Sequence, residues 1–193
     1  MEKWSEASRD PDLIRAYLAG DAGAFDLLYG RYKQPLYGYL QKLTLGKDAD
    51  VDDLFQKTWL KAIHNLERYE DREKFSAWLM RIAYHQFIDG YRKVKRRGEE
   101  AFDDSLDAVL PAPDSALPDS RIRNRELMEA IESAVAELSP EVRAVFIMRN
   151  DDIPFREIAE IQQCSINTCL ARMQYALKNL RKSLSLRYSE VAK

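Results

Sequence analysis

The sequence is poor in cysteine and histidine, the residues that build disulfide frameworks and most transition-metal sites. It has two of each in 193 residues. Cys164 and Cys169 fit neither a disulfide framework nor a metal-ligand spacing, and His64 and His85 lie far from them in the sequence. We therefore expect two reduced, packed thiols and no bound metal or other cofactor.

Glycine and long apolar runs are also scarce. No glycine-rich phosphate loop, paired-carboxylate constellation or nucleophile motif stands out, so the sequence favours a protein that is not an enzyme. No apolar run approaches the roughly 20 residues that span a bilayer. The N-terminus MEKWSEASRDPD lacks the basic-then-apolar pattern of a signal peptide, and we expect a cytoplasmic protein.

The charge of the chain is unevenly distributed. Residues 1–97 carry a net charge of +3, residues 98–120 carry −7 without any Lys or Arg, and residues 121–193 carry +2. The acidic segment also contains Pro111, Pro113 and Pro118, which oppose helix formation. Together with 46% apolar and 32% charged residues, this pattern predicts an all-α protein. Two small helical domains, 1–97 and 121–193, would be joined by an acidic flexible linker at 98–120.

Apolar residues recur at helical spacing through the first domain. They predict helices over about 13–18, 25–43, 49–66 and 74–97. Pro35 lies inside the second of these and predicts a kink or a break there.

The fourth predicted helix has two different faces. Phe75 and Trp78 belong to its apolar stripe, whereas basic side chains recur on another side, at Arg81, His85, Arg92 and Arg96. A cationic stripe can lie along a phosphate backbone. Tyr69, in the preceding segment ERYEDREKFSAW, is an aromatic residue that could hold an unstacked base.

The second domain ends in a helix-turn-helix pattern. Ser139 and Pro140 predict the start of one helix, with Ser139 as its N-cap. In FREIAEIQQCSINTCLARMQYALKNLRK, a short helix is followed by the turn QQC and by a longer helix capped by Ser165. In such a unit the first turns of the second helix enter the major groove of DNA, where Arg, Asn and Gln read base edges.

The order of these parts resembles the small, two-domain extracytoplasmic-function (ECF) group of bacterial sigma-70 family sigma factors. DVDDLFQKTWLKAI is similar to the family's core-polymerase-binding helix, and FSAWLMRIAYHQFIDGYRKVKRR to its helix for the downstream (−10) promoter element. The helix-turn-helix is similar to the family's reader of the upstream (−35) element. The resemblance implies that the partners are RNA polymerase core, through its β′ and β subunits, promoter DNA, and an anti-sigma factor.

The resemblance also implies three sets of site residues. The set for polymerase core is Asp52, Asp53, Gln56, Lys57 and Leu60. The set for the −10 region, where DNA is recognised and opened, is Tyr69, Arg72, Lys74, Arg81, Tyr84, His85, Arg92, Lys93, Arg96 and Arg97. The set for the −35 region is Ser165, Asn167, Thr168, Ala171, Arg172, Gln174, Tyr175 and Lys178.

Three positions depart from the family pattern. Lys57 stands where an acid is common, His85 where Asn is usual, and Leu170 where a cation is frequent. The charge pairing with polymerase and the promoter sequence therefore cannot be copied from relatives.

Two other interpretations of the same residues remain open. A free-standing helix-turn-helix regulator would bind duplex DNA without polymerase core. A helical adaptor would use its basic stretches only as solvated surface, and reversing the charges of Arg92, Lys93 and Arg96 would then leave function unchanged.

Overall fold

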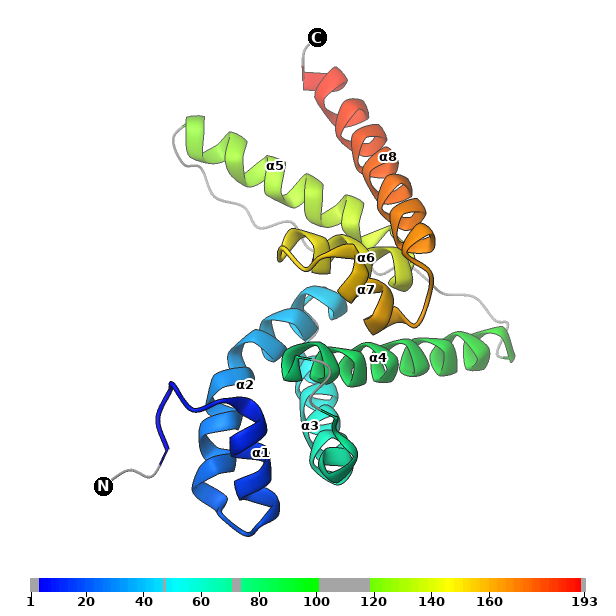
Figure 1. Cartoon of the computed structure of the whole chain (residues 1–193). Coiled ribbons are helices and arrows are strands. Elements are labelled where there is room, and N and C mark those ends of the chain that lie inside the picture. Colours follow the sequence, from blue (N-terminus) through cyan, green and yellow to red (C-terminus); the bar gives the residue numbers. More distant parts are fainter. Residues whose placement is uncertain (1–3, 47, 71–73, 101–118, 192–193) are drawn as a thin grey trace.

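The computed structural model describes residues 4–46, 48–70, 74–100 and 119–191. Every regular element in these ranges is a helix, which confirms the all-helical prediction (Figure 1). The elements are α1 (Asp10–Leu18), α2 (Ala22–Thr44), α3 (Asp48–Asn65), a 3-10 turn η1 (Leu66–Arg68), α4 (Phe75–Glu100), α5 (Asp119–Ala136), α6 (Pro140–Asn150), α7 (Phe155–Gln162) and α8 (Ile166–Val191). Among the described helices, none has both the length and the apolar character that crossing a bilayer requires.

Two details of the predicted helices are corrected. The fourth helix continues to Glu100, and α5 already begins at Asp119, so both ends of the predicted linker are helical. No proline precedes Pro111 in the linker, which explains why α4 can extend past Arg97. The rest of the predicted linker, 101–118, lies outside the described residues.

Pro35 bends α2 without breaking it. The helix runs from Ala22 to Thr44 with Pro35 inside it, and its ribbon changes direction partway along (Figure 1). Proline removes one backbone hydrogen bond and crowds the preceding turn, so a kink is the expected response of a helix held in place by packing. Here that packing comes from α1, α3 and α4, which all contact α2.

The N-terminal half, α1 to α4, packs around a core rich in aromatic residues. Trp59 of α3 contacts Phe25 and Tyr29 of α2, with ring centroids 5.9 and 4.9 Å apart. Phe75 is 1% exposed, as its place on the apolar stripe predicts. This core holds α3 and α4 side by side and leaves one face of each helix to solvent.

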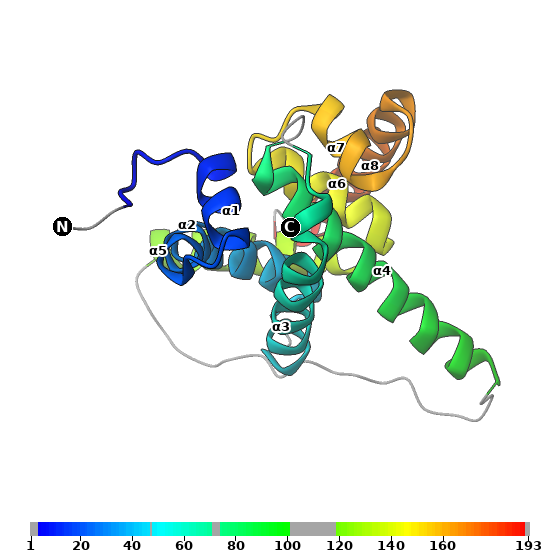
Figure 2. The ribbon, with the colours of Figure 1, turned by 60° about the horizontal axis from the view of Figure 1, so that its bottom comes forward.

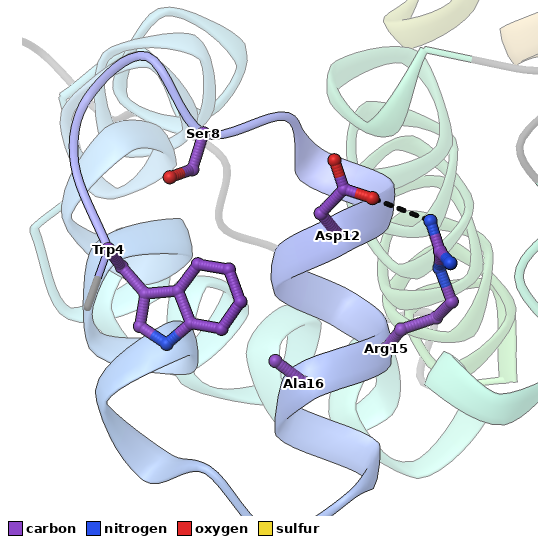
Figure 3. A pocket seen from close by; sticks show the side chains of 5 residues that line it. All are labelled: Trp4, Ser8, Asp12, Arg15 and Ala16. Carbon is purple, nitrogen blue, oxygen red and sulfur yellow. Dashed lines mark hydrogen bonds and ion pairs between the residues drawn. The ribbon is translucent and has the colours of Figure 1, made fainter.

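The segment before α1 folds back over that helix. Trp4 donates a hydrogen bond from Nε1 to Asp21 at 3.0 Å, and Asp12 pairs with Arg15 at 2.5 Å. Trp4, Ser8, Asp12, Arg15 and Ala16 line an open hollow there (Figure 3). None of the predicted site residues borders this hollow.

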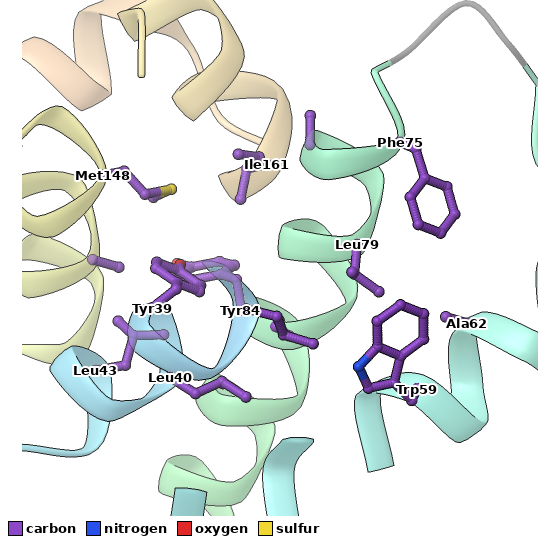
Figure 4. Packing of buried hydrophobic residues seen from close by; sticks show 14 of the residues in the cluster. Tyr39, Leu40, Leu43, Trp59, Ala62, Phe75, Leu79, Tyr84, Met148 and Ile161 are labelled. Atoms are coloured by element: carbon purple, nitrogen blue, oxygen red, sulfur yellow. The ribbon is translucent and has the colours of Figure 1, made fainter. Parts of the chain in front are cut away.

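The C-terminal half, α5 to α8, packs directly against the N-terminal half. Helix α6 contacts α2 and α4, and helix α7 contacts α4 (Figure 2). One buried cluster runs through both halves, where Tyr39 and Tyr84 meet Met148 and Ile161 (Figure 4). A second, smaller cluster joins α5, α6 and α8 and includes Leu138, Ala176 and Leu180. The two predicted domains therefore share a core in this arrangement.

Candidate nucleic-acid interface

One face of α3 presents the residues predicted to contact polymerase. All five are exposed, and Leu60 is 60% exposed although it is apolar. The opposite face is held by Val51, Thr58 and Trp59, which are buried. The periodicity of the helix thus places Asp52, Asp53, Gln56, Lys57 and Leu60 together on the outside.

The charges on this face are partly paired within the chain. Lys57 Nζ lies 2.5 Å from Asp53 Oδ2, one helical turn away. Tyr37 donates its hydroxyl proton to Asp52 at 3.0 Å. Because Asp53 and Lys57 are both more than half exposed, their ion pair is weak and a stronger partner can break it.

The end of α4 carries the exposed cations of the second predicted set. Arg92, Lys93 and Arg96 are exposed, and so is Lys74 just before the helix. Arg81 and His85 are half-buried nearer its centre. Arg72 lies outside the described residues, and Arg97 is helical but its side chain is not described.

Tyr84 does not lie on the open surface. Its side chain is only 4% exposed, under the C-terminal half, and burial raises its pKa to about 12. The position therefore cannot reach a base while the two halves are packed together. Sequence periodicity alone could not reveal this, because the covering residues come from α6 and α7.

Tyr69 is half-buried against its own domain. Its ring lies edge-on to Phe75 and Trp78, with centroids 5.6 and 5.2 Å apart. Such contacts fix the ring at the edge of the aromatic core.

His85 lies in a partly buried, positively charged environment. Burial is the main cause that lowers its pKa, and nearby Arg81, Lys61 and Arg92 lower it further against the opposing effect of Asp89. Its Nε2 atom has no hydrogen-bond partner among the described residues. The lowered pKa therefore favours the neutral imidazole.

Cations of the −10 set form ion pairs with the C-terminal half. Lys74 Nζ lies 3.7 Å from Glu157 Oε2 on α7, and Arg92 Nη2 lies 3.5 Å from Glu141 Oε1 on α6. Lys42 also pairs with Asp151. Carboxylates of the C-terminal half thus pair with Lys74 and Arg92, two cations that the family resemblance assigns to −10 DNA.

The helix-turn-helix consists of α7, a turn and α8. Gln163 ends α7 in the left-handed region, with φ of 52°. Ser165 accepts a hydrogen bond from the Thr168 amide at 3.1 Å, which confirms it as the cap of the second helix. Ser139, by contrast, occupies the N-cap position of α6, but its hydroxyl makes no capping hydrogen bond.

Most of the third predicted set lies on the open face of α8. Six of its members are exposed, namely Ser165, Asn167, Ala171, Gln174, Tyr175 and Lys178. Thr168 is half-buried, and its hydroxyl bonds to that of Ser165 at 2.8 Å.

Arg172 is held inside the helix-turn-helix. Its Nη1 donates to Gln162 Oε1 at 2.5 Å and lies 3.7 Å from Cys164 Sγ. Gln162 is buried and donates in turn to the Glu141 carbonyl at 3.0 Å. Sequence reasoning missed Gln162 as the partner of Arg172, because the two residues meet only when α7 and α8 cross.

The two cysteines were predicted to be packed thiols. Both cysteines are free, with Cys169 buried and Cys164 half-buried. The described His, Cys, Asp and Glu side chains form no group of three or more that could hold a metal ion.

Two family models match this chain. The model for sigma-70 region 2 matches residues 28–97, and the model for sigma-70 region 4 matches residues 128–180. The two matches fall on α2 to α4 and on α5 to α8, the helices that carry the three sets.

Relatives match over most of their own length. The ECF RNA polymerase sigma factor SigW of Bacillus subtilis is 28% identical over 89% of this chain and 94% of that protein. SigX of the same organism is 29% identical over 86% of this chain and 87% of that protein. The ECF RNA polymerase sigma-E factor of Escherichia coli is 26% identical over 88% and 91%.

Two solved structures share the fold. The sigma factor RpoE of Bartonella quintana, in complex with the anti-sigma factor NepR, has a TM-score of 0.63 and 24% identity, and the match covers 83% of this chain and 96% of that chain. CnrH, in complex with the cytosolic domain of CnrY, has a TM-score of 0.65 and 22% identity over 93% and 99%. With region 2 in its N-terminal half and region 4 in its C-terminal half, the chain belongs to the ECF type of the sigma-70 family of RNA polymerase sigma factors.

Proposed function

We propose that this sigma factor binds polymerase core and promoter DNA through three separate surfaces, two in region 2 and one in region 4. The exposed face of α3 binds RNA polymerase core, the end of α4 and the preceding loop bind the −10 element, and the start of α8 reads the −35 element. The observation that carries the proposal is the separation of these surfaces. The three exposed surfaces are an acidic and apolar face on α3, a cationic end on α4 and the capped start of α8. All three lie on helices matched to regions 2 and 4.

As a member of this family, the chain directs RNA polymerase to promoters and is not itself an enzyme. The small net charge of each domain supports the proposal that polymerase contributes to promoter affinity. The net charges of +3 and +2 on the two domains supply few phosphate contacts, and such contacts dominate DNA affinity. The free chain is therefore a weak DNA binder, and polymerase completes the affinity.

Promoter binding requires regions 2 and 4 to separate. Tyr84 is buried between them, and Lys74 and Arg92 are paired with carboxylates of region 4. The interface also buries the Tyr39 hydroxyl without a hydrogen bond among the described residues. Such an unsatisfied group costs about 1–3 kcal/mol, so part of the gain from packing the halves together is offset.

Residues 98–120 would allow this separation. Their seven acids and absence of bases fit a segment that passes through the positively charged cleft of polymerase, where a polyanion is attracted much as nucleic acid is. The solved complex of the sigma factor RpoE with the anti-sigma factor NepR further supports an anti-sigma factor as a partner of this chain.

The function is tested by sequencing the transcripts that purified core polymerase makes in vitro with and without this protein. We expect new start sites that need both proteins and share two upstream sequence elements. Tight, sequence-specific binding of the free chain to duplex DNA, with no transcripts that depend on it, would instead identify a free-standing regulator.

The role of the α4 end is tested by charge reversal. The double variant Lys93→Glu and Arg96→Glu changes two exposed cations that form no ion pair with region 4 within the described residues. Transcription should fall at every promoter, because phosphate contacts carry no sequence information. Lys33→Glu, at an exposed position of α2, is the matched control and should leave transcription unchanged. Equal activity of both variants would assign the α4 cations to solvated surface.

A further inference from the structure

The two cysteines of the chain touch each other. Their Sγ atoms lie 3.4 Å apart, although they are the only cysteines in 193 residues. Cys164 lies in the turn after α7, and Cys169 lies in the first part of α8. The four residues between them, 165–168, include Ser165, Asn167 and Thr168 of the −35 set.

The two thiols differ in access. Cys164 is half-buried and lines an open hollow of about 670 Å³ together with Arg156, Glu160 and Ser165. Cys169 is 0% exposed. A small oxidant from solvent therefore meets Cys164 first.

The surroundings of the two sulfurs also differ, and this difference indicates which sulfur reacts first. The Arg172 guanidinium points one N–H at Cys164 Sγ, at 3.7 Å, and the open hollow leaves that sulfur within reach of small molecules from solvent. Burial raises the pKa of Cys169, so that residue stays protonated. Cys164 is thus the attacking sulfur and Cys169 is the neighbour that can resolve the product.

We propose that Cys164 and Cys169 form an oxidisable dithiol site whose substrate is hydrogen peroxide. The Cys164 thiolate attacks one peroxide oxygen, the O–O bond breaks, and the departing hydroxide takes a proton to leave as water. This leaves a sulfenic acid on Cys164. The Cys169 sulfur then attacks the Cys164 sulfur, the S–O bond breaks, and the leaving hydroxide takes the Cys169 proton as a second water. Two electrons pass from the dithiol to one peroxide molecule, and one disulfide forms.

We expect the closing of this bond to disturb the start of α8. A disulfide holds its sulfurs about 2.05 Å apart, so closing the bond draws the two sulfurs together from the present 3.4 Å and pulls on the turn before α8. Ser165 follows Cys164 directly and caps α8 through the Thr168 amide. Arg172 also loses the free thiol that it contacts. If region 4 reads the −35 element as proposed above, oxidation weakens that recognition.

The dithiol itself is tested on the full-length chain by intact mass after treatment with hydrogen peroxide. We expect the loss of two hydrogens, a cross-link between Cys164 and Cys169 in the peptide map, no dimer on a non-reducing gel, and reversal by dithiothreitol. The Cys169→Ala variant should stop at a sulfenic acid that dimedone traps on Cys164, and Cys164→Ala should not react. Thermal unfolding confirms that each variant is folded. A folded wild-type chain that keeps its two hydrogens, or a Cys169 that reacts as readily as Cys164, overturns the site.

The coupling to promoter recognition is tested separately, with reduced and oxidised protein in transcription by core polymerase. Transcription from a promoter that depends on its −35 element should fall about five-fold on oxidation, the size expected when one helix cap is lost, and Cys164→Ala should not respond. An unchanged yield from fully oxidised protein overturns the coupling and leaves the dithiol site in place. Absence of transcription with the reduced chain would overturn the proposed function instead, and the mass result would be unaffected.

Discussion

The guanidinium of Arg92 on α4 lies 3.5 Å from the carboxylate of Glu141, at the start of α6. This contact joins region 2 to region 4 across 49 residues of sequence, and Lys74 with Glu157 forms a second contact of the same kind. A carboxylate and a DNA phosphate are both anions that pair with such cations. If Lys74 and Arg92 bind the −10 element as proposed, region 4 and that DNA compete for the same side chains of region 2.

Removing these carboxylate charges should expose the −10 surface of the free chain. The double variant Glu141→Gln and Glu157→Gln should bind a single-stranded −10 oligonucleotide about two- to five-fold more tightly, because each exposed ion pair contributes about 0–1 kcal/mol. Fluorescence anisotropy at low salt measures the affinity. Glu160→Gln is the matched control, since Glu160 pairs with Arg156 on its own helix. An equal gain in the control would show that only net charge matters.

Reversing Asp53 should weaken the binding of polymerase core. The Asp53→Lys variant removes an exposed acid of α3 and its ion pair with Lys57, and it places two cations on that face. We expect about a ten-fold loss of affinity, in the range measured for charge pairs at interfaces. Titration of labelled core polymerase provides the measurement. Asp26→Lys, at an exposed position of α2, should bind core normally, and unchanged affinity of Asp53→Lys would remove α3 from the core-binding surface.

Arg172 and Lys178 should differ in what they contribute to −35 binding. If Arg172 turns from Gln162 to a base, Arg172→Ala should relax discrimination at the upstream element by about 1–3 kcal/mol. Lys178→Ala should weaken all sequences alike if the exposed ammonium of this residue contacts a phosphate as proposed. Competition between consensus and mutated promoters separates the two effects. Equal loss on every promoter would place Arg172 among the phosphate contacts.

His85 should make the chain less stable in mild acid. Burial lowers its pKa in the folded protein, whereas the unfolded chain keeps the ordinary value of about 6.5. The unfolded state therefore takes up a proton as the pH falls below about 6.5, and stability decreases down to the folded pKa. The variant His85→Asn should show a flatter dependence of Tm on pH between 7.5 and 5.5. An unchanged slope in His85→Asn would assign the dependence to other groups.

The helices and the exposed faces could be predicted because they depend on local periodicity. Val51, Trp59 and Ala62 recur at helical spacing and are buried. Asp53 and Gln56 therefore lie on the exposed face, regardless of which helices pack against the buried one. The cap at Ser165 is equally local, since its hydroxyl needs only an amide three residues ahead. Capping by Ser139 was predicted on the same grounds, but its hydroxyl makes no capping hydrogen bond. The free amides in the first turn of a helix can be satisfied in other ways, for example by water.

Contacts between distant segments could not be predicted from these patterns. Tyr84 has an apolar ring and a polar tip, so its spacing on α4 is compatible with both a core position and a DNA contact. Its burial depends on α6 and α7, which follow the linker in the sequence. The pairing of Arg172 with Gln162 and the contact of the two sulfurs depend likewise on how α7 crosses α8.

The sequence alone thus determined which segments are helical, which faces they bury, where the charges gather and which family the order of parts resembles, because each of these depends on residues a few positions apart. Only the tertiary structure decided that region 4 covers Tyr84, that Glu141 and Glu157 pair with cations assigned to DNA, and that two scarce cysteines lie in contact. The physical reason is that side-chain interactions act over a few ångströms of space, and a linear pattern does not specify which distant side chains the packing of apolar surfaces will bring within that range.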